Sequence, residues 1–518
     1  MAAERPLEHY AWFSVGAALA TMALKTLAWQ ATGSVGLLSD ALESLINLAA
    51  ALLALSMLRL AAAPPDAAHP YGRFKAEYIA SGIEGALIVF AAISLMYAAV
   101  PPPGATVLDA PLLPGLVNAH SHAFQRAFAG LAERRESASD DFWSWRERMY
   151  QVALRITPLQ LRAITAQLYI ELLQGGYTQV CEFNYLQHDT DGERYADPLA
   201  VSWALADAAG DAGIGLTLMP ALYERAGFTQ PQLRPDQRRF ATTPAGVWEA
   251  ARQIDASGRR LVNAGLVIHS LRAAAPASIL QLQQLAHGFD GPVHIHVAEQ
   301  VAEVDDCLAA TGQRPIEWLA RQGLLDARWQ LVHATHTVPS EIDAVARSGA
   351  GVVICPSTEA NLGDGLCDLR GWLAAGVPLT LGSDSHATRD WREELRWLDY
   401  GQRLALRQRN VAAAPELGQP STAERLFARA VNGAAAAGEP AWGLVVGARA
   451  DALVADATDP ALLGVPPSRW LDALVFSSPG RSWRNVMVAG RWVIRNQCHQ
   501  QAHAVASAFA AVMHELWA

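Results

Sequence analysis

The chain has 518 residues, of which 51% are hydrophobic and 17% charged, and its formal net charge at pH 7 is -10. A negative chain without a basic stripe is not expected to bind nucleic acid, and its length favours two or more folding units. Five scattered cysteines without a CxxC pair favour a reducing compartment and argue against a disulfide framework.

The first hundred residues contain three apolar runs, at about 10–29, 35–58 and 78–100. Each run is close to the ~20 residues that cross a bilayer, so the sequence predicts about three transmembrane helices in contact with membrane lipid. The first run is long and lacks a basic n-region, which argues against a signal peptide. Helices buried in a protein core are the alternative.

A proline-rich joint begins with PPPG, and residues 101–111 are interpreted as a linker. Short apolar runs then alternate with helical stretches. Eight of them read as strands: LLPGLVNAHSH, TQVCEFNY, GLTLMPALY, AGLVIHS, GPVHIHVAE, WQLVHATH, GVVICPS and VPLTLGSDSH. This order predicts an α/β fold, a (β/α)8 barrel over 112–435, with its active site at the carboxyl ends of the strands. Residues 436–518, including GLVVGARADALVAD and RNVMVAGRWVIRN, predict the strands of an incomplete small β-sandwich and a terminal helix.

Polar residues at the strand ends predict a metal centre. His120 and His122 share one face of the first strand, His296 ends the fifth and Asp384 ends the eighth. Three imidazoles and one carboxylate leave a position for water, which is typical of catalytic zinc, here one ion per chain. Iron or manganese is the alternative, and each histidine taken singly could be a core residue.

Three residues are candidates for proton transfer. Asp384 can bind zinc and accept a proton from the water that the metal activates. Glu299 can carry a proton to a departing nitrogen, and His333 can polarise the group under attack. The sequence shows no nucleophilic serine or cysteine arrangement.

These motifs resemble the amidohydrolase superfamily and, within it, the N-formimino-L-glutamate deiminases. The most particular matching segments are HAFQRA, FWSWRE and STEANLGDG. The resemblance implies zinc-dependent hydrolysis of formiminoglutamate to N-formyl-L-glutamate and ammonia, a step of histidine breakdown. It also implies that the small-molecule substrate is held by Gln125, Arg146, Tyr185, His269 and Arg272. The arginine fork suits the two carboxylates of a glutamate moiety, although Arg146 and Arg272 could also be ordinary helix or loop residues. Glu359 and Asn361 receive no role.

The first hundred residues resemble the cation diffusion facilitators, which export divalent metals. The similar stretches include GSVGLLSDALESLINLAA, where Glu43 and Asn47 stand one helical turn apart near Asp40. That family has six helices, whereas the sequence here predicts about three before the barrel. We therefore interpret residues 1–100 as a truncated cation-efflux segment joined to a deiminase.

Several alternatives remain open at this point. The barrel could deaminate an aminopyrimidine, a purine or an S-adenosylhomocysteine-like compound, the fusion could be non-functional, or the chain could transport metal. A homodimer is also possible. Attachment to the bacterial inner membrane is expected, with the barrel in the cytoplasm. However, the loop before the third run contains Arg59, Arg73 and Lys75, and the positive-inside rule favours a cytoplasmic position for it. Three full crossings would then place the barrel outside.

Overall fold

The computed structural model describes residues 15–17, 19–27, 44, 48, 52, 56, 110–135, 140–477 and 483–518. The chain divides into two units, Met1–Asp109 and Ala110–Ala518. In the first unit, residues 15–17 and 19–27 are helical, within the first predicted apolar run. Most of the three runs, with Asp40, Glu43 and Asn47, lies outside the described residues. Among the helices that are described, none is long and apolar enough to cross a membrane.

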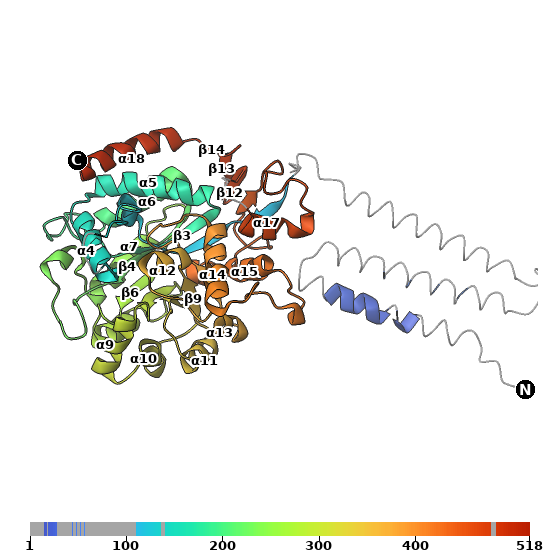
Figure 1. Cartoon of the computed structure of the whole chain (residues 1–518), viewed down its shortest axis with the longest axis horizontal. Coiled ribbons are helices and arrows are strands. Elements are labelled where there is room, and N and C mark those ends of the chain that lie inside the picture. Colours follow the sequence, from blue (N-terminus) through green and yellow to red (C-terminus); the bar gives the residue numbers. More distant parts are fainter. Residues whose placement is uncertain are drawn as a thin grey trace, which may run out of the picture. The chain divides into compact units, whose positions relative to one another are not determined.

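The second unit is built around a closed barrel of eight parallel strands, as the sequence predicts (Figure 1). The strands are β2 (Leu116–Ser121), β3 (Tyr177–Asn184), β4 (Gly215–Leu222), β6 (Leu266–Ser270), β7 (Val293–Val297), β8 (Trp329–His333), β9 (Gly351–Ile354) and β10 (Leu379–Leu381). They pair in sequence order, β10 pairs with β2, and β3 pairs with β4, so the ring has no free edge. A three-residue strand, β5 (Val262–Ala264), pairs with β4 just before β6.

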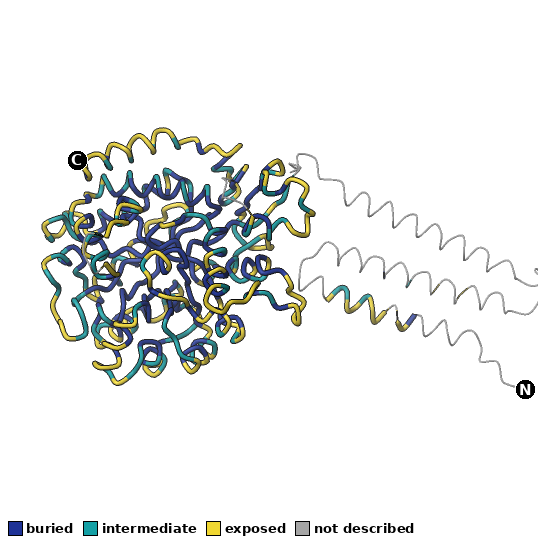
Figure 2. Tube along the Cα trace, viewed as in Figure 1, coloured by how far each residue is buried: buried dark blue, intermediate teal, exposed yellow. Residues whose placement is uncertain are grey.

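Helices follow the strands and cover the barrel. They are α4 (Phe142–Ala153), α5 (Pro158–Gln174), α6 (Ala200–Ala212), α7 (Pro244–Asp255), α8 (Pro276–Leu285), α9 (Val301–Thr311), α10 (Pro315–Arg321), α11 (Pro339–Ser348), α12 (Pro356–Leu362), α13 (Leu369–Ala374), α14 (Trp391–Leu406), α15 (Thr422–Ala430) and α16 (Ala434–Ala437). Short 3-10 helices are η1 (Ala123–Ala127), η2 (Pro235–Phe240) and η3 (Pro415–Leu417). Because helices cover the outside and side chains fill the inside, every residue of the eight barrel strands is buried (Figure 2).

Local sequence explains where the helices nearest the site begin. Thr157 caps α5 by accepting the N–H of Gln160, and Pro158 occupies the first helical position, where no N–H is needed. The carboxylate of Asp141 accepts the N–H groups of Trp143 and Ser144 and so fixes the start of α4. This helix carries the FWSWRE segment.

The strands outside the barrel form one five-stranded antiparallel sheet in the described part of the chain, which is the single layer that takes the place of the incomplete small β-sandwich predicted from the sequence. The sheet has the order β1 (Leu112–Pro114), β11 (Ala452–Val454), β12 (Asn485–Val488), β13 (Arg491–Arg495) and β14 (Cys498–His499). The segment LLPGLVNAHSH is not one strand, since Gly115 separates β1 in this sheet from β2 in the barrel. Residues 443–451 are turn and loop, and only the end of GLVVGARADALVAD is a strand.

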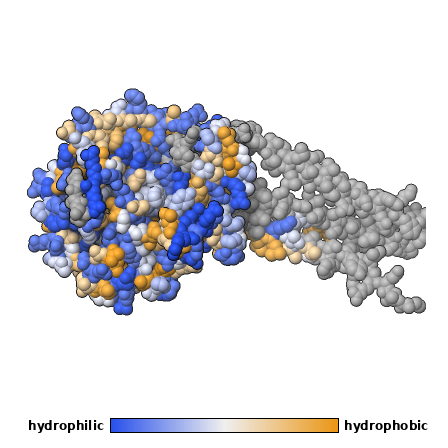
Figure 3. Space-filling view, viewed as in Figure 1, coloured by the Kyte–Doolittle hydropathy of each residue, from blue (hydrophilic) through white to orange (hydrophobic). Residues whose placement is uncertain are grey.

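The C-terminal helix supports the segment that follows His122. The last elements are η4 (Pro467–Arg469), α17 (Trp470–Phe476) and α18 (Ala502–Trp517), which packs against α5. The indole Nε1 of Trp517 donates to Ala127 O at 3.0 Å, and the Arg126 guanidinium lies 4.9 Å from the Phe509 ring centre. On the face seen in Figure 3, hydrophobic residues occur in separate patches among hydrophilic ones.

Candidate metal centre and active site

The predicted ligands converge at the carboxyl ends of β2, β7 and β10. The Nε2 atoms of His120 and His296 lie 3.0 Å apart. The Nε2 atoms of His120 and His122 each lie 3.4 Å from Oδ1 of Asp384. The candidate ligand atoms of the three histidines all lie within 4.8 Å of one another, and all three side chains are buried.

The chemistry of these donors fits a divalent cation. Burial lowers the pKa of His122 to about 3, and burial with the nearby His333 lowers the pKa of His120 well below its usual range. Neutral imidazoles present lone pairs, so two Nε2 atoms at contact distance repel unless a proton or a cation lies between them. Nδ1 of His122 is 3.0 Å from Phe183 O and can donate to it, which leaves Nε2 for a metal. Three histidines and one aspartate suit zinc.

A buried carboxylate that sequence reasoning missed holds the first two ligands. Glu182 in β3 accepts the Ser121 hydroxyl at 2.7 Å, the Ala123 N–H at 2.6 Å and the Tyr169 hydroxyl at 3.2 Å. It therefore fixes the backbone on both sides of His122. An acidic residue inside the apolar strand TQVCEFNY was the available signal, since a buried glutamate needs partners.

A second network joins β2 to β10. The Asn118 amide donates to the Ser383 hydroxyl at 2.7 Å and accepts the Ser383 N–H at 2.9 Å. The ring of His386 bridges the Ser383 hydroxyl and the carbonyl of His122, at 3.1 Å each. These bonds tie the strand of the first two ligands to the strand that ends at Asp384.

The two proton-transfer candidates other than Asp384, namely Glu299 and His333, lie beside the predicted ligands. Nε2 of His333 is 3.6 Å from Oε1 of Glu299 and 3.8 Å from Oδ2 of Asp384. Burial raises the pKa of Glu299 to about 7. Burial acts to lower the pKa of His333, but the carboxylates of Glu299, Glu359 and Asp384 outweigh it and raise this pKa to about 10. Glu359, which had no predicted role, lies 3.3 Å from Nδ1 of His333 and orients the ring.

The residues predicted to hold the substrate line one pocket with the metal ligands. They are Gln125, Arg146, Tyr185, His269 and Arg272, and they meet His122, His296, Glu299, His333 and Asp384 there, with Trp145 and Leu362 in the wall. His120 lies deeper and is fully buried. The Gln125 amide donates to the Tyr185 hydroxyl at 3.1 Å.

The two arginines keep their charges unpaired within the described residues. The Arg146 guanidinium lies 4.4 Å from the Trp143 ring centre, and that of Arg272 lies 5.5 Å from the same ring. Burial lowers the pKa of Arg146, and its Nε has no hydrogen-bond partner among the described residues. Two guanidinium groups that line the pocket of the candidate metal ligands without an ion pair to a carboxylate in the described residues are suited to a dicarboxylate ligand.

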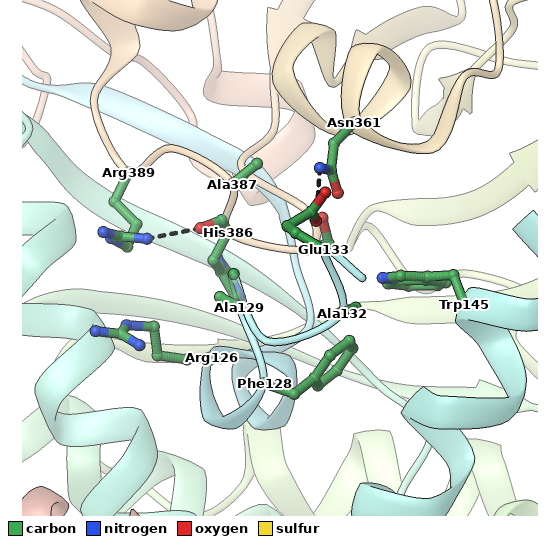
Figure 4. A pocket seen from close by; sticks show the side chains of 12 residues that line it. Arg126, Phe128, Ala129, Ala132, Glu133, Trp145, Asn361, His386, Ala387 and Arg389 are labelled. Carbon is green, nitrogen blue, oxygen red and sulfur yellow. Dashed lines mark hydrogen bonds between the residues drawn. The ribbon is translucent and has the colours of Figure 1, made fainter. Parts of the chain in front are cut away.

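A larger cavity of about 400 Å³ shares Trp145 with this pocket (Figure 4). The Asn361 amide donates to Oε1 of Glu133 at 2.9 Å across it. Arg126 and Arg389 also line it, and both pair with Glu171, at 2.8 Å and 3.1 Å. Because these arginines already have a carboxylate partner, Arg146 and Arg272 stay the predicted substrate arginines.

Comparison with known proteins agrees with this geometry. Residues 112–493 match the amidohydrolase family. The chain is 47% identical over 418 residues to a formimidoylglutamate deiminase of Pseudomonas aeruginosa, and the match covers 80% of the chain and 91% of that relative. The crystal structure of an amidohydrolase from Brucella melitensis superimposes with a TM-score of 0.75 at 41% identity, covering 80% of this chain and 93% of that one.

The N-terminal unit matches a different family. Residues 11–106 match the cation efflux transmembrane domain. Over 91 residues the chain is 60% identical to an uncharacterised transporter of Synechocystis, a match that covers 18% of this chain and 29% of the transporter. Since the family match and the deiminase relative both span most of the chain and include the whole histidine–aspartate cluster, the protein belongs to the amidohydrolase family.

Proposed function

We propose that the chain hydrolyses N-formimino-L-glutamate to N-formyl-L-glutamate and ammonia with one zinc ion. The observation that carries the proposal is the pair Arg146 and Arg272, which line the pocket of the candidate metal ligands and form no ion pair with a carboxylate among the described residues. An uncharged aminated ring would offer no carboxylate to these two half-buried guanidinium groups. The Pseudomonas relative, a formimidoylglutamate deiminase at 47% identity, supports the same substrate.

The metal ligands, Glu299 and His333 can each take a separate role in this reaction. Zinc held by the three histidines and Asp384 would supply Lewis-acid activation of water near neutral pH. Water adds to the formimino carbon, the bond to the terminal nitrogen breaks, and both protons of the water leave with that nitrogen as ammonia. Glu299 moves a proton to the departing nitrogen, and the ring of His333 polarises the group under attack.

Ammonia release tests the proposal. The purified full-length chain is given formiminoglutamate and, separately, an aminopyrimidine, an aminopurine and S-adenosylhomocysteine. We expect turnover of formiminoglutamate alone. Turnover of a ring substrate in preference to it would overturn the substrate assignment, and inactivity on all four would favour a non-functional fusion.

The two arginines give a test at residue level. Arg146→Ala and Arg272→Ala should each raise KM for formiminoglutamate by about 10- to 100-fold, since each removes a charge-assisted contact to a substrate carboxylate. Arg252→Ala is the matched control, because Arg252 is an exposed arginine of α7 that pairs with Glu249. Unchanged steady-state kinetics in both pocket variants would contradict the dicarboxylate assignment.

We also propose that the N-terminal unit attaches the enzyme to the bacterial inner membrane, with the barrel in the cytoplasm. The match of residues 11–106 to a transmembrane domain supports attachment. The cytoplasmic side is favoured by the reaction, because formiminoglutamate arises from histidine breakdown inside the cell. The free cysteines of the barrel unit suit the same reducing compartment.

A further inference from the structure

Glu303 is a buried carboxylate beside the catalytic pocket that none of the roles above uses. It lies in the first turn of α9 and is 3% exposed. Its Oε2 accepts the backbone N–H of Glu299 at 3.1 Å. Burial raises the pKa of Glu303, and Arg272 together with the backbone N–H groups of Glu299 and Ala298 limits the shift. The carboxylate therefore faces the proton-transfer segment.

The backbone held by Glu303 is strained. Ala298 has φ 53°, in the left-handed region that residues with a side chain seldom adopt. This conformation turns the chain at the end of β7, between His296 and Glu299, and the turn leaves Oε1 of Glu299 3.6 Å from Nε2 of His333. The carbonyl of Ala298 accepts the N–H of His336 at 3.0 Å. A strained turn persists only where its surroundings fix it, and here Glu303 fixes one side and His336 the other.

Glu303 also acts on Arg272. Burial lowers the pKa of this guanidinium, but the nearby charge of Glu303 does most to reverse the effect, and the net pKa is raised. Oε1 of Glu303 has no hydrogen-bond partner in the described part of the chain. One oxygen thus serves the backbone of Glu299, while the negative charge of the group raises the pKa of Arg272, which is charged in either case.

We propose that Glu303 is a positioning residue that, by accepting the backbone N–H of Glu299, holds the carboxylate of Glu299 against His333. The assignment rests on the backbone geometry, and only its readout in kcat rests on the proposed function. Simple capping of α9 is the competing explanation, since a glutamate in the first turn stabilises a helix on its own.

Two variants test the acceptor. Glu303→Gln keeps an oxygen that can accept the Glu299 N–H, so kcat should stay within about 3-fold of wild type. Glu303→Ala removes the acceptor as well, and kcat should fall about 10- to 100-fold. Zinc content should remain normal in both, because Glu303 is not a ligand.

Glu341 provides the matched control. It is equally buried, accepts the N–H of Val338 at 3.1 Å and pairs with Arg314 at 3.0 Å, but it serves the start of α11. Glu341→Ala should lower the melting temperature without lowering kcat. A wild-type kcat in Glu303→Ala, or an equal loss of kcat in both alanine variants, would overturn the proposal and leave only capping.

The outcome is distinguishable from failure of the proposed function. If the wild-type chain deaminates another substrate instead, the fall of kcat in Glu303→Ala on that substrate still decides the proposal. If Glu303→Ala does not fold, Glu303→Asp decides, because it keeps a carboxylate in the first turn of α9 but its shorter side chain does not reach the Glu299 N–H. In that variant kcat should fall about 10- to 100-fold, and a wild-type kcat would overturn the proposal.

Discussion

Backbone strain concentrates at and beside the residues of the candidate site. Of the eleven non-glycine residues with positive φ in the described part of the chain, five surround the metal cluster: Ala298, His333, Ala334, Asp384 and His386. All five lie at the carboxyl ends of β7, β8 and β10, where the chain must leave the strand and aim a side chain back across the barrel. Such conformations cost about 1–3 kcal/mol each and survive where the surrounding fold over-determines them.

At the same scale, the acid–base role of Glu299 can be separated from metal binding. Glu299→Gln should lower kcat about 10²- to 10⁴-fold, the usual contribution of a positioned proton carrier. Zinc content should stay near one per chain, because the contact of Glu299 is with His333 at 3.6 Å and the ligand cluster is made by other residues. Elemental analysis with steady-state kinetics measures both quantities. Asp384→Asn is the comparison variant and should lose metal. Loss of zinc from Glu299→Gln would mean that the ligand set is misassigned.

A buried histidine outside the reaction gives a prediction about pH. Burial lowers the pKa of His294 from 6.5 to about 4 while its Nε2 bonds to Ala436 O at 3.0 Å. The unfolded chain therefore binds more protons than the folded one between these values, and stability is lost as the pH falls through this window. Between pH 7.5 and pH 5 the wild type should lose about 2 kcal/mol more unfolding free energy than His294→Gln.

Urea unfolding of chelator-treated protein at the two pH values measures that difference. Chelation removes the contribution of metal release, which also depends on pH. His503→Gln, at an exposed position of α18, should behave as the wild type. Equal losses in the wild type and His294→Gln would show that His294 titrates normally in the folded chain.

The residues of the candidate site that lie at strand ends could be predicted from the sequence. His120, His122, His296 and Asp384 follow apolar strands, so their meeting at one rim follows from the barrel. Glu182 and Glu359 were missed as functional residues because their value depends on partners far away in the chain, Ser121 and His333. A local sequence pattern can indicate that a buried carboxylate needs a partner, but it does not show which distant residue that partner is.

At the scale of elements, the eight barrel strands were predictable because a strand covered on both faces is an uninterrupted apolar run. The outer sheet was not. Its strands have two to five residues, too few for a periodic pattern, and β1 pairs with β11 across nearly the whole unit. The predicted continuous first strand failed at Gly115, where the chain passes from one sheet to the other.

Two glycines are expected to respond in opposite ways to replacement by alanine. A Cβ at Gly115 would lie 2.3 Å from Oγ1 and 2.4 Å from Cγ2 of Thr178, so Gly115→Ala should destabilise the unit by about 1–3 kcal/mol. Gly210, inside α6, has open space around it, and Gly210→Ala should stabilise the unit by about 0.5–1 kcal/mol. Thermal unfolding measures both. Adding Thr178→Gly to Gly115→Ala should recover part of the loss, and no recovery would show that the clash is not with Thr178.

At the scale of the whole molecule, attachment to the membrane is the main open prediction. We expect deiminase activity to sediment with bacterial membranes and to remain there after a carbonate wash, because apolar helices are held by burial in the bilayer. Protease added to intact spheroplasts should leave the barrel uncut, whereas the same protease should cut it after lysis. Prompt digestion from outside would place the barrel on the other face, in agreement with three crossings.

The pairing of Leu112 with Val454 has a consequence for synthesis on the ribosome. β1 leaves the exit tunnel early, yet its partner strand follows only after every barrel strand has been made. The ring itself cannot close until β10 joins β2, and Asp384 emerges just behind it. Translation therefore delivers the barrel's first histidines long before the residues that complete their cluster. A nascent chain stalled before Asp384 holds an open sheet of apolar strands, the form of this protein that most needs a chaperone.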